Sequence, residues 1–195
     1  MSLTATVDPI ALIEMTNLKA TDQLWKLAKH PQLGMRPGWI EELAQNPDPA
    51  VRQRLAPNPA IAECRDTVEQ LSGDHNPTVR IALAENPALA NFPEVMERLS
   101  IDENAWVRLS FAENPALAGF PKIVKRLSVD VDKYVRIYLA RNPAIVNFPE
   151  IIEELSNDKD SDVRRWLARS PAIPSSTAST QPSPTQPAVK KAPTL

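Results

Sequence analysis

Apolar and polar positions along the chain repeat with a fixed spacing of 28 residues. Each copy contains a valine followed by an arginine, and the five valines are Val51, Val79, Val107, Val135 and Val163. Leu-Ala or Phe-Ala begins four residues after each valine, and Asn-Pro-Ala comes next in four of the five copies. A fixed period of this size is typical of a stack of similar structural units.

Each copy predicts two short helices. The first follows an N-cap asparagine or aspartate and stops before a proline, because the residue preceding proline is forced out of the helical conformation. The N-cap residues are Asp48, Asn76, Asn104, Asp132 and Asp160. The second helix begins at Pro93, Pro121 or Pro149, since proline is favoured at the first helical position, and it ends at a Leu-Ser pair.

Helices of about nine residues are marginal in water on their own. The valine, leucine and alanine columns therefore have to be buried between neighbouring units. We expect an all-α fold, an α-solenoid of about five to six two-helix repeats of 28 residues.

The repeats divide the chain into four parts. The clear copies occupy residues 51–173, and residues 21–50 read as a degenerate copy without the Val-Arg pair. Asp8-Pro9 predicts a helix within residues 1–20 that caps the N-terminal end of the stack, since the first unit has no neighbour to cover it. Residues 174–195 are rich in Pro, Ser and Thr and contain no aromatic or acidic residue, so we expect a disordered tail.

The composition of the chain excludes several classes of protein and of site. The formal charge of the 195-residue chain is −2, and no apolar run reaches the length of about 18 residues that a membrane span needs. No secretory signal is recognisable, so we expect a cytoplasmic protein that does not bind membranes. One cysteine, Cys64, excludes a disulfide framework, and we expect it to be a small buried apolar side chain. No catalytic motif, metal-ligand spacing or cofactor motif is present, so we expect neither an enzyme nor a bound cofactor.

A second pattern pairs an aspartate with the Val-Arg motif. Asp-x4-Val-Arg runs from Asp74 to Arg80, Asp102 to Arg108, Asp130 to Arg136 and Asp158 to Arg164. This pattern resembles HEAT repeats, in which such an aspartate and arginine link neighbouring units. The run Val-Arg-x-x-Leu-Ala-x-Asn-Pro also resembles the leucine-rich repeat variant family. The resemblance covers about residues 46–173 and implies a HEAT-like superhelix.

The resemblance also implies a class of function. HEAT-like proteins are mostly binding scaffolds, and one branch contains DNA glycosylases, of which this chain has no specific feature. Some variant-repeat proteins are associated with an iron–sulfur cluster, but Cys64 alone does not supply cluster ligands. We expect the aspartate and arginine columns to form a structural ladder of charge-assisted hydrogen bonds between units.

The variable columns are the candidates for binding. Tyr134 and Tyr138 are four residues apart, so they share a helix face. Trp106 occupies the column of Tyr134 in the preceding unit, and Trp166 occupies the column of Tyr138 in the following unit. Arg141 and Arg169 lie one turn further along their helices. Trp, Tyr and Arg dominate binding hot spots, so these six residues form a candidate partner-binding patch. The alternative is that the rings fill gaps between helices.

The sequence supports three hypotheses for function. The first is a protein- or peptide-binding scaffold that uses the concave face lined by the Val-Arg helices. The second is a nucleic-acid-binding protein, which needs a continuous basic stripe, whereas the part before the tail is net acidic. The third is a component of a larger assembly that docks through the uncapped C-terminal end.

Overall fold

The computed structural model describes residues 21–30, 33–35, 38–170 and 173. Every regular element within these residues is a helix, so the prediction of an all-α fold is confirmed for this part of the chain. The capping helix expected within residues 1–20 and the disordered tail expected at 174–195 lie outside the described residues. Among the described helices, none combines the length and hydrophobicity that a membrane-spanning helix needs.

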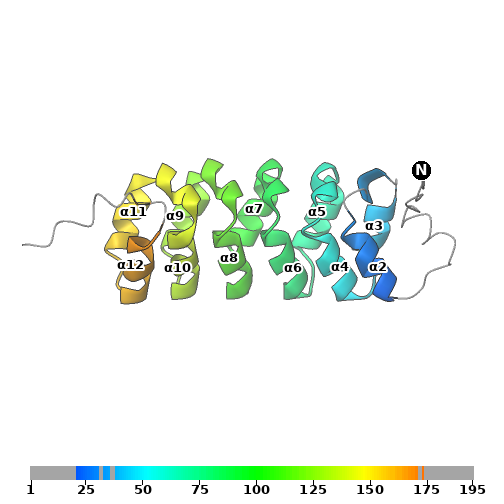
Figure 1. Ribbon diagram of the computed structural model, residues 1–195, viewed down its shortest axis with the longest axis horizontal. Helices are drawn as coiled ribbons and strands as arrows, with labels where there is room; N and C mark the ends of the chain where they lie inside the picture. Colours follow the sequence, from blue (N-terminus) through cyan, green and yellow to red (C-terminus); the bar gives the residue numbers. More distant parts are fainter. Residues whose placement is uncertain (1–20, 31–32, 36–37, 171–172, 174–195) are drawn as a thin grey trace, which may run out of the picture.

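The α-helices lie in two rows that run along the molecule in chain order (Figure 1). The first row holds α2 (Thr21–Ala28), which lacks the Val-Arg pair, and the five Val-Arg helices, which are α4 (Pro49–Leu55), α6 (Pro77–Ala84), α8 (Ala105–Ala112), α10 (Lys133–Arg141) and α12 (Ser161–Ala168). The second row holds α3 (Trp39–Ala44), α5 (Arg65–Ser72), α7 (Pro93–Ser100), α9 (Pro121–Ser128) and α11 (Pro149–Ser156). Each helix contacts the next helix of its own row, so successive 28-residue units lie side by side.

A 3-10 helix connects the first-row helix of each unit to its second-row helix, at a place where the sequence indicates only a loop. These connections are η1 (Leu33–Met35), η2 (Pro59–Glu63), η3 (Pro87–Asn91), η4 (Pro115–Gly119) and η5 (Pro143–Asn147). Consecutive 3-10 helices also contact one another. Each unit before α12 therefore contributes three packed segments to the stack.

The core lies between the two rows and is built from the repeated apolar columns. All five valines of the Val-Arg pairs are fully buried, as are Ala56, Ala84, Ala112 and Ala140. Small alanine side chains allow neighbouring helices to approach closely. Ala168 occupies the same column in α12 and is exposed, because no further described helix packs against it.

A column of buried asparagines joins each unit to the preceding one. Asn114 is 2% exposed, and its Nδ2 donates to the carbonyl oxygens of Ala84 at 2.7 Å and Asn86 at 3.0 Å. Its Oδ1 accepts from the backbone amide of Ala116 at 2.8 Å. The side chain thus satisfies carbonyls at the end of α6 and the first amide of its own 3-10 helix. The same bonds recur at Asn58, Asn86 and Asn142.

Candidate functional site

The arginine of each Val-Arg pair reaches forward into the next unit. Arg80 binds Asp102 through two parallel hydrogen bonds, Nε to Oδ2 at 2.7 Å and Nη2 to Oδ1 at 2.9 Å. Arg108 binds Asp130 and Arg136 binds Asp158 with the same geometry. Arg52 and Asp74 add a further pair at the N-terminal side of this series.

The arginines from Arg80 onward also donate to the backbone carbonyl of the aspartate in their own unit, whereas Arg52 donates to the carbonyl of Asn46. Arg108 Nη1 donates to the Asp102 carbonyl at 2.6 Å, and Arg136 Nη1 donates to that of Asp130 at 2.7 Å. Arg164 makes this bond to Asp158 as well, and it is exposed at the end of the described stack. We call these arginines and aspartates the Arg–Asp ladder.

Burial and hydrogen bonding act in opposite directions on the ladder carboxylates. Burial raises the pKa of Asp74, but the hydrogen bonds from the Arg52 guanidinium and the Asn76 amide outweigh it and hold that pKa below its ordinary value. The same balance lowers the pKa of Asp158, where Arg136 and the Asp160 amide are the donors. These carboxylates are therefore most favourable in the folded chain when they are ionised.

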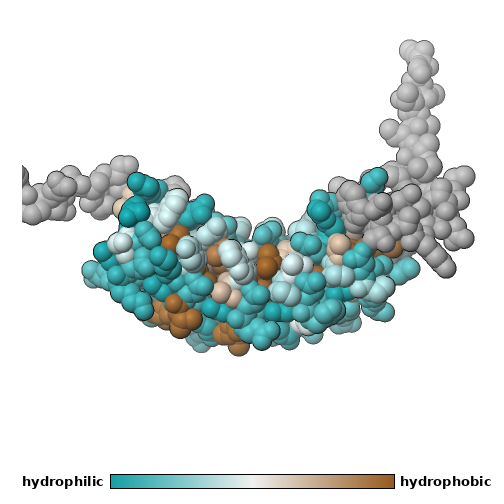
Figure 2. All heavy atoms as spheres, turned by 90° about the horizontal axis from the view of Figure 1, so that it is seen from below, coloured by the Kyte–Doolittle hydropathy of each residue, from teal (hydrophilic) through white to brown (hydrophobic). Residues whose placement is uncertain are grey.

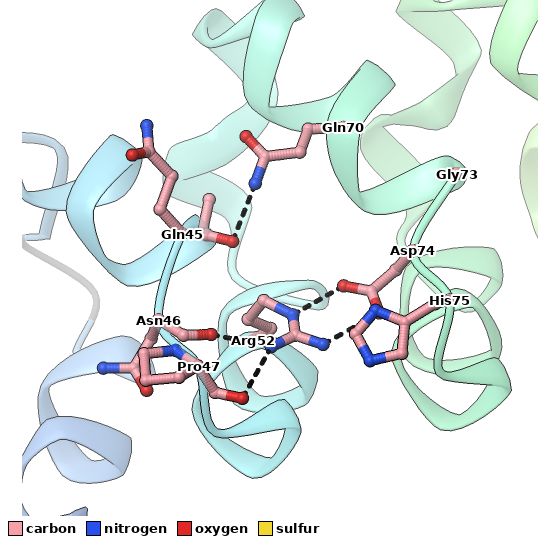
Figure 3. Close-up of a pocket in the computed structure, with 9 residues that line it drawn as sticks. Gln45, Asn46, Pro47, Arg52, Gln70, Gly73, Asp74 and His75 are labelled. Carbon is pink, nitrogen blue, oxygen red and sulfur yellow. Dashed lines mark hydrogen bonds and ion pairs between the residues drawn. The ribbon is translucent and has the colours of Figure 1, made fainter.

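A pocket of about 410 Å³ is lined by the Arg52–Asp74 pair and by residues of the turns that precede α4 and follow α5 (Figure 3). Arg52 Nη1 donates to the carbonyls of Asn46 and Pro47, and Gln70 Nε2 donates to the carbonyl of Ala44. The side chains of Arg52, Asp74 and Gln70 in Figure 3 are thus engaged in hydrogen bonds within the protein. We assign the pocket to the ladder rather than to a ligand.

The aromatic residues singled out from the sequence lie on the exposed face of α8, α10 and α12. Trp106 is 66% exposed, Tyr134 is 55% exposed and Trp166 is 39% exposed. Tyr138 is half-buried and packs against the edge of the core. The rings therefore do not simply fill gaps between helices. The face of the molecule in Figure 2 is mainly hydrophilic, with small separate hydrophobic patches.

Arg141 connects two of these rings across neighbouring helices. Its guanidinium carbon lies 4.9 Å from the centroid of the Tyr138 ring and 5.1 Å from that of the Trp166 ring. Its Nη1 also lies 3.7 Å from a carboxylate oxygen of Glu113 in the preceding unit. A cation held between two aromatic faces is stabilised by their quadrupoles. Arg141 therefore links the Tyr138 ring of α10 to the Trp166 ring of α12.

The ends of the first-row helices add a charge gradient to this surface. Glu85, Glu113, Arg141 and Arg169 occupy one column and are all exposed. The column is acidic at α6 and α8 and basic at α10 and α12. We use the name aromatic–arginine surface for Trp106, Tyr134, Tyr138, Trp166, Arg141 and Arg169.

Comparison with known proteins gives no family. Neither a protein-family model nor a curated protein sequence matches the chain. The site is therefore interpreted from its own residues.

Cys64 and His75 lie outside the aromatic–arginine surface. Cys64 is half-buried, packs against the core and precedes α5, so the expectation of a buried apolar side chain holds only in part; burial raises the pKa of its thiol. His75 is exposed, with Nδ1 3.6 Å from an oxygen of Asp74. Within the described residues, no three His, Cys, Asp or Glu side chains are grouped so that they would hold a metal ion.

The asparagine column is the main structural feature that sequence reasoning missed. In the sequence its residues belong to Asn-Pro-Ala, a pattern that by itself indicates only the point where a helix stops. The repetition of asparagine, where any residue can precede a proline, was the available signal for a buried amide.

Proposed function

We propose that this chain is a non-catalytic α-solenoid of the HEAT-like type that binds a protein or peptide partner. In this proposal the 28-residue units form a scaffold of about five to six repeats, and the partner lies on the exposed face of the first-row helices. The Arg–Asp ladder and the asparagine column hold the units in register. The variable side chains between them provide specificity.

The exposure of Trp106 and Tyr134 is the observation that carries this proposal. Both rings are more than half exposed on neighbouring helices, and Tyr134 lies one turn before Tyr138 of the Tyr138–Arg141–Trp166 cluster. Large aromatic side chains lose much apolar surface to a partner on binding, at a low cost in conformational entropy. Because tryptophan, tyrosine and arginine dominate interface hot spots, a surface of this composition favours protein recognition.

The ion pairs of the C-terminal half favour this function over nucleic-acid binding. Lys125 pairs with Glu154 at 2.5 Å, Arg126 with Glu97 at 2.6 Å and Arg165 with Asp162 at 3.1 Å. Binding to nucleic acid gains free energy when basic side chains displace counterions from the phosphates. Basic side chains that are already paired with carboxylates displace fewer counterions, so these residues are less suited to binding phosphates.

Affinity capture from native extract tests the proposal. We expect a partner that the full chain retains, and that Trp106→Ala and Trp166→Ala each release at least about tenfold more readily, as loss of a hot spot implies. Ile101→Ala is the matched control, because Ile101 is 66% exposed but lies in the turn after α7. Capture that both tryptophan variants leave unchanged would refute the proposal, and so would salt-dependent binding of DNA through the same face.

A further inference from the structure

We propose that the proline-rich segment 174–195 of the same chain occupies the aromatic–arginine surface. This inference rests on the proposed function and names an occupant for the same site. The segment would lie along the first row from α12 toward α6, in competition with an external partner.

The chemistry of the segment fits the surface. It contains Pro174, Pro182, Pro184, Pro187 and Pro193 among 22 residues, counted from the sequence. Proline-rich segments favour an extended, preformed helix without internal hydrogen bonds. Such segments dock on rows of exposed aromatic rings, because little conformational entropy is lost on binding. Three neighbouring helices provide such a row, which consists of Trp166, Tyr138, Tyr134 and Trp106.

The order of charges fits one direction of binding. The segment has two charged residues, Lys190 and Lys191, near its end, and it has no acidic residue. A segment that leaves α12 and runs toward α6 passes the rings first and brings these lysines toward Glu113 and Glu85. Its uncharged first part lies beside Arg141 and Arg169, so no like charges meet there.

The length of the segment is sufficient for this path. Ile173, which packs against the core, is nine residues before Pro182 and seventeen before Lys190. At about 3.1 Å per residue in an extended proline helix, these residues reach at most about 28 Å and about 53 Å from Ile173, so the path to α8 and α6 does not require every residue to be extended. Neighbouring helices lie about 8–10 Å apart, so α8 is about 20 Å and α6 about 30 Å from α12.

Paramagnetic relaxation in the full chain tests the inference. A nitroxide label is placed at Ala188→Cys in a Cys64→Ser background, and broadening of backbone amide signals is measured. We expect broadening of α6, α8 and α10, with α7 and α9 of the second row much less affected. Broadening confined to α12, or spread equally over both rows, would overturn the inference.

Substitutions identify the contacts responsible. Changing Pro182, Pro184 and Pro187 to alanine is expected to reduce the broadening of α8 severalfold, and Tyr138→Ala with Trp166→Ala is expected to do the same. Two matched controls are expected to leave the broadening unchanged. One combines Ser175→Ala, Thr177→Ala and Ser179→Ala, and the other is Ile101→Ala alone. Broadening that survives the proline and aromatic substitutions would contradict the proposed contacts.

Mixing separates binding within one chain from exchange between copies. A ¹⁵N-labelled chain without the nitroxide is mixed with a nitroxide-labelled chain at natural isotope abundance. Broadening that persists in this mixture shows binding between copies and overturns the assignment to the same chain. The capture experiment stays independent. If the label shows no docking while Trp106→Ala and Trp166→Ala still release the external partner, this inference fails and the proposed function stands.

Discussion

Arg108 and Asp130 are 22 residues apart in the chain and meet through two parallel hydrogen bonds, Nε to Oδ2 at 2.7 Å and Nη2 to Oδ1 at 3.0 Å. The same guanidinium binds the carbonyl of Asp102 at 2.6 Å. One side chain therefore fixes the turns of two consecutive units relative to each other. The planar guanidinium suits this task because its donors diverge in a fixed geometry.

Arg108→Ala is expected to lower the free energy of unfolding by about 3 kcal/mol, because removing one partner leaves the other charge mostly buried and unpaired. The side chain of Asp130 is 8% exposed, so water replaces the lost hydrogen bonds poorly. Urea unfolding monitored by circular dichroism measures the change.

Arg164→Ala is the matched control for this prediction. Arg164 occupies the same column but is exposed, and its hydrogen bond is to the backbone carbonyl of Asp158. Its loss is expected to cost less than about 1 kcal/mol, as for most surface substitutions. Equal losses for the two variants would contradict a role of the bidentate pair in stability.

Asn114→Ala is expected to cost about 3 kcal/mol, since three hydrogen bonds of about 1 kcal/mol each are lost, two of them buried. The side chain bridges Ala84, Asn86 and the amide of Ala116. Asn91→Ala, at the exposed end of η3, is the control and is expected to change stability little. Similar unfolding midpoints for the two variants would be inconsistent with this role of the column.

Asn114→Asp adds a dependence on pH. The introduced carboxyl faces two carbonyl oxygens in a buried position, so its pKa is raised in the folded state relative to the unfolded state. The stability of the variant relative to the wild type is therefore highest below the unfolded-state pKa of about 3.9 and falls as pH rises through the folded-state pKa. Urea unfolding of both proteins from about pH 3 to about pH 8, which spans the titration of an aspartate with a raised pKa, measures this difference in stability. A difference that stays constant over this range would contradict the prediction.

The ladder carboxylates predict the opposite dependence for the wild type. The pKa values of Asp74 and Asp158 are lowered on folding, so their contribution is fully present above the unfolded-state value of about 3.9. It is lost as pH falls through the folded-state pKa. Asp74→Asn removes one titrating group, and the stability gap between wild type and this variant should narrow on acidification. A gap that widens toward low pH would show that the sign is wrong.

Arg141 and Trp166 are expected to be coupled by about 0.5–1 kcal/mol, the range for a cation–π contact at an exposed site. A double-mutant cycle with alanine at both positions measures this energy through urea unfolding. Trp39, in α3 at the other end of the stack, provides an additive control when it is combined with Arg141→Ala, because distant sites without shared partners act independently. Zero coupling would remove the contact from the description of the surface.

Much of the fold can be predicted from the sequence because the units are nearly identical. The N-cap column of Asp48 and its equivalents places the start of every first-row helix from α4 onward, and Asp48 Oδ1 accepts from the amide of Ala50 as expected for a cap. The second-row prolines likewise mark the starts of α7, α9 and α11. Local signals of this kind act within a few residues, so they can be recognised without tertiary information.

The contacts between units could not be fully derived in this way. The spacing of Asp102 and Arg108 suggests a link but does not show whether an arginine binds the aspartate six residues earlier or 22 residues later. The structure uses the backbone carbonyl of the first and the carboxylate of the second. The 3-10 helices were also missed, because five residues that start with proline carry too short a pattern for a helical period.

The exposure of the aromatic residues depended on stacking as well. Tyr138 and Trp166 share a column, yet one is half-buried and the other is exposed, because α12 covers one side of α10 and no further described helix covers α12. Equal sequence positions thus differ in environment according to their place in the stack.

The asparagine column has a consequence for how such a chain can change its length. Each asparagine binds the backbone of the unit 28 residues earlier, and the residues that it binds are equivalent in every copy. An in-frame duplication or deletion of one whole unit therefore returns every amide to an equivalent carbonyl, whereas an insertion of any other length within a unit breaks the match. Growth by whole-unit duplication is the genetic route that leaves these bonds intact.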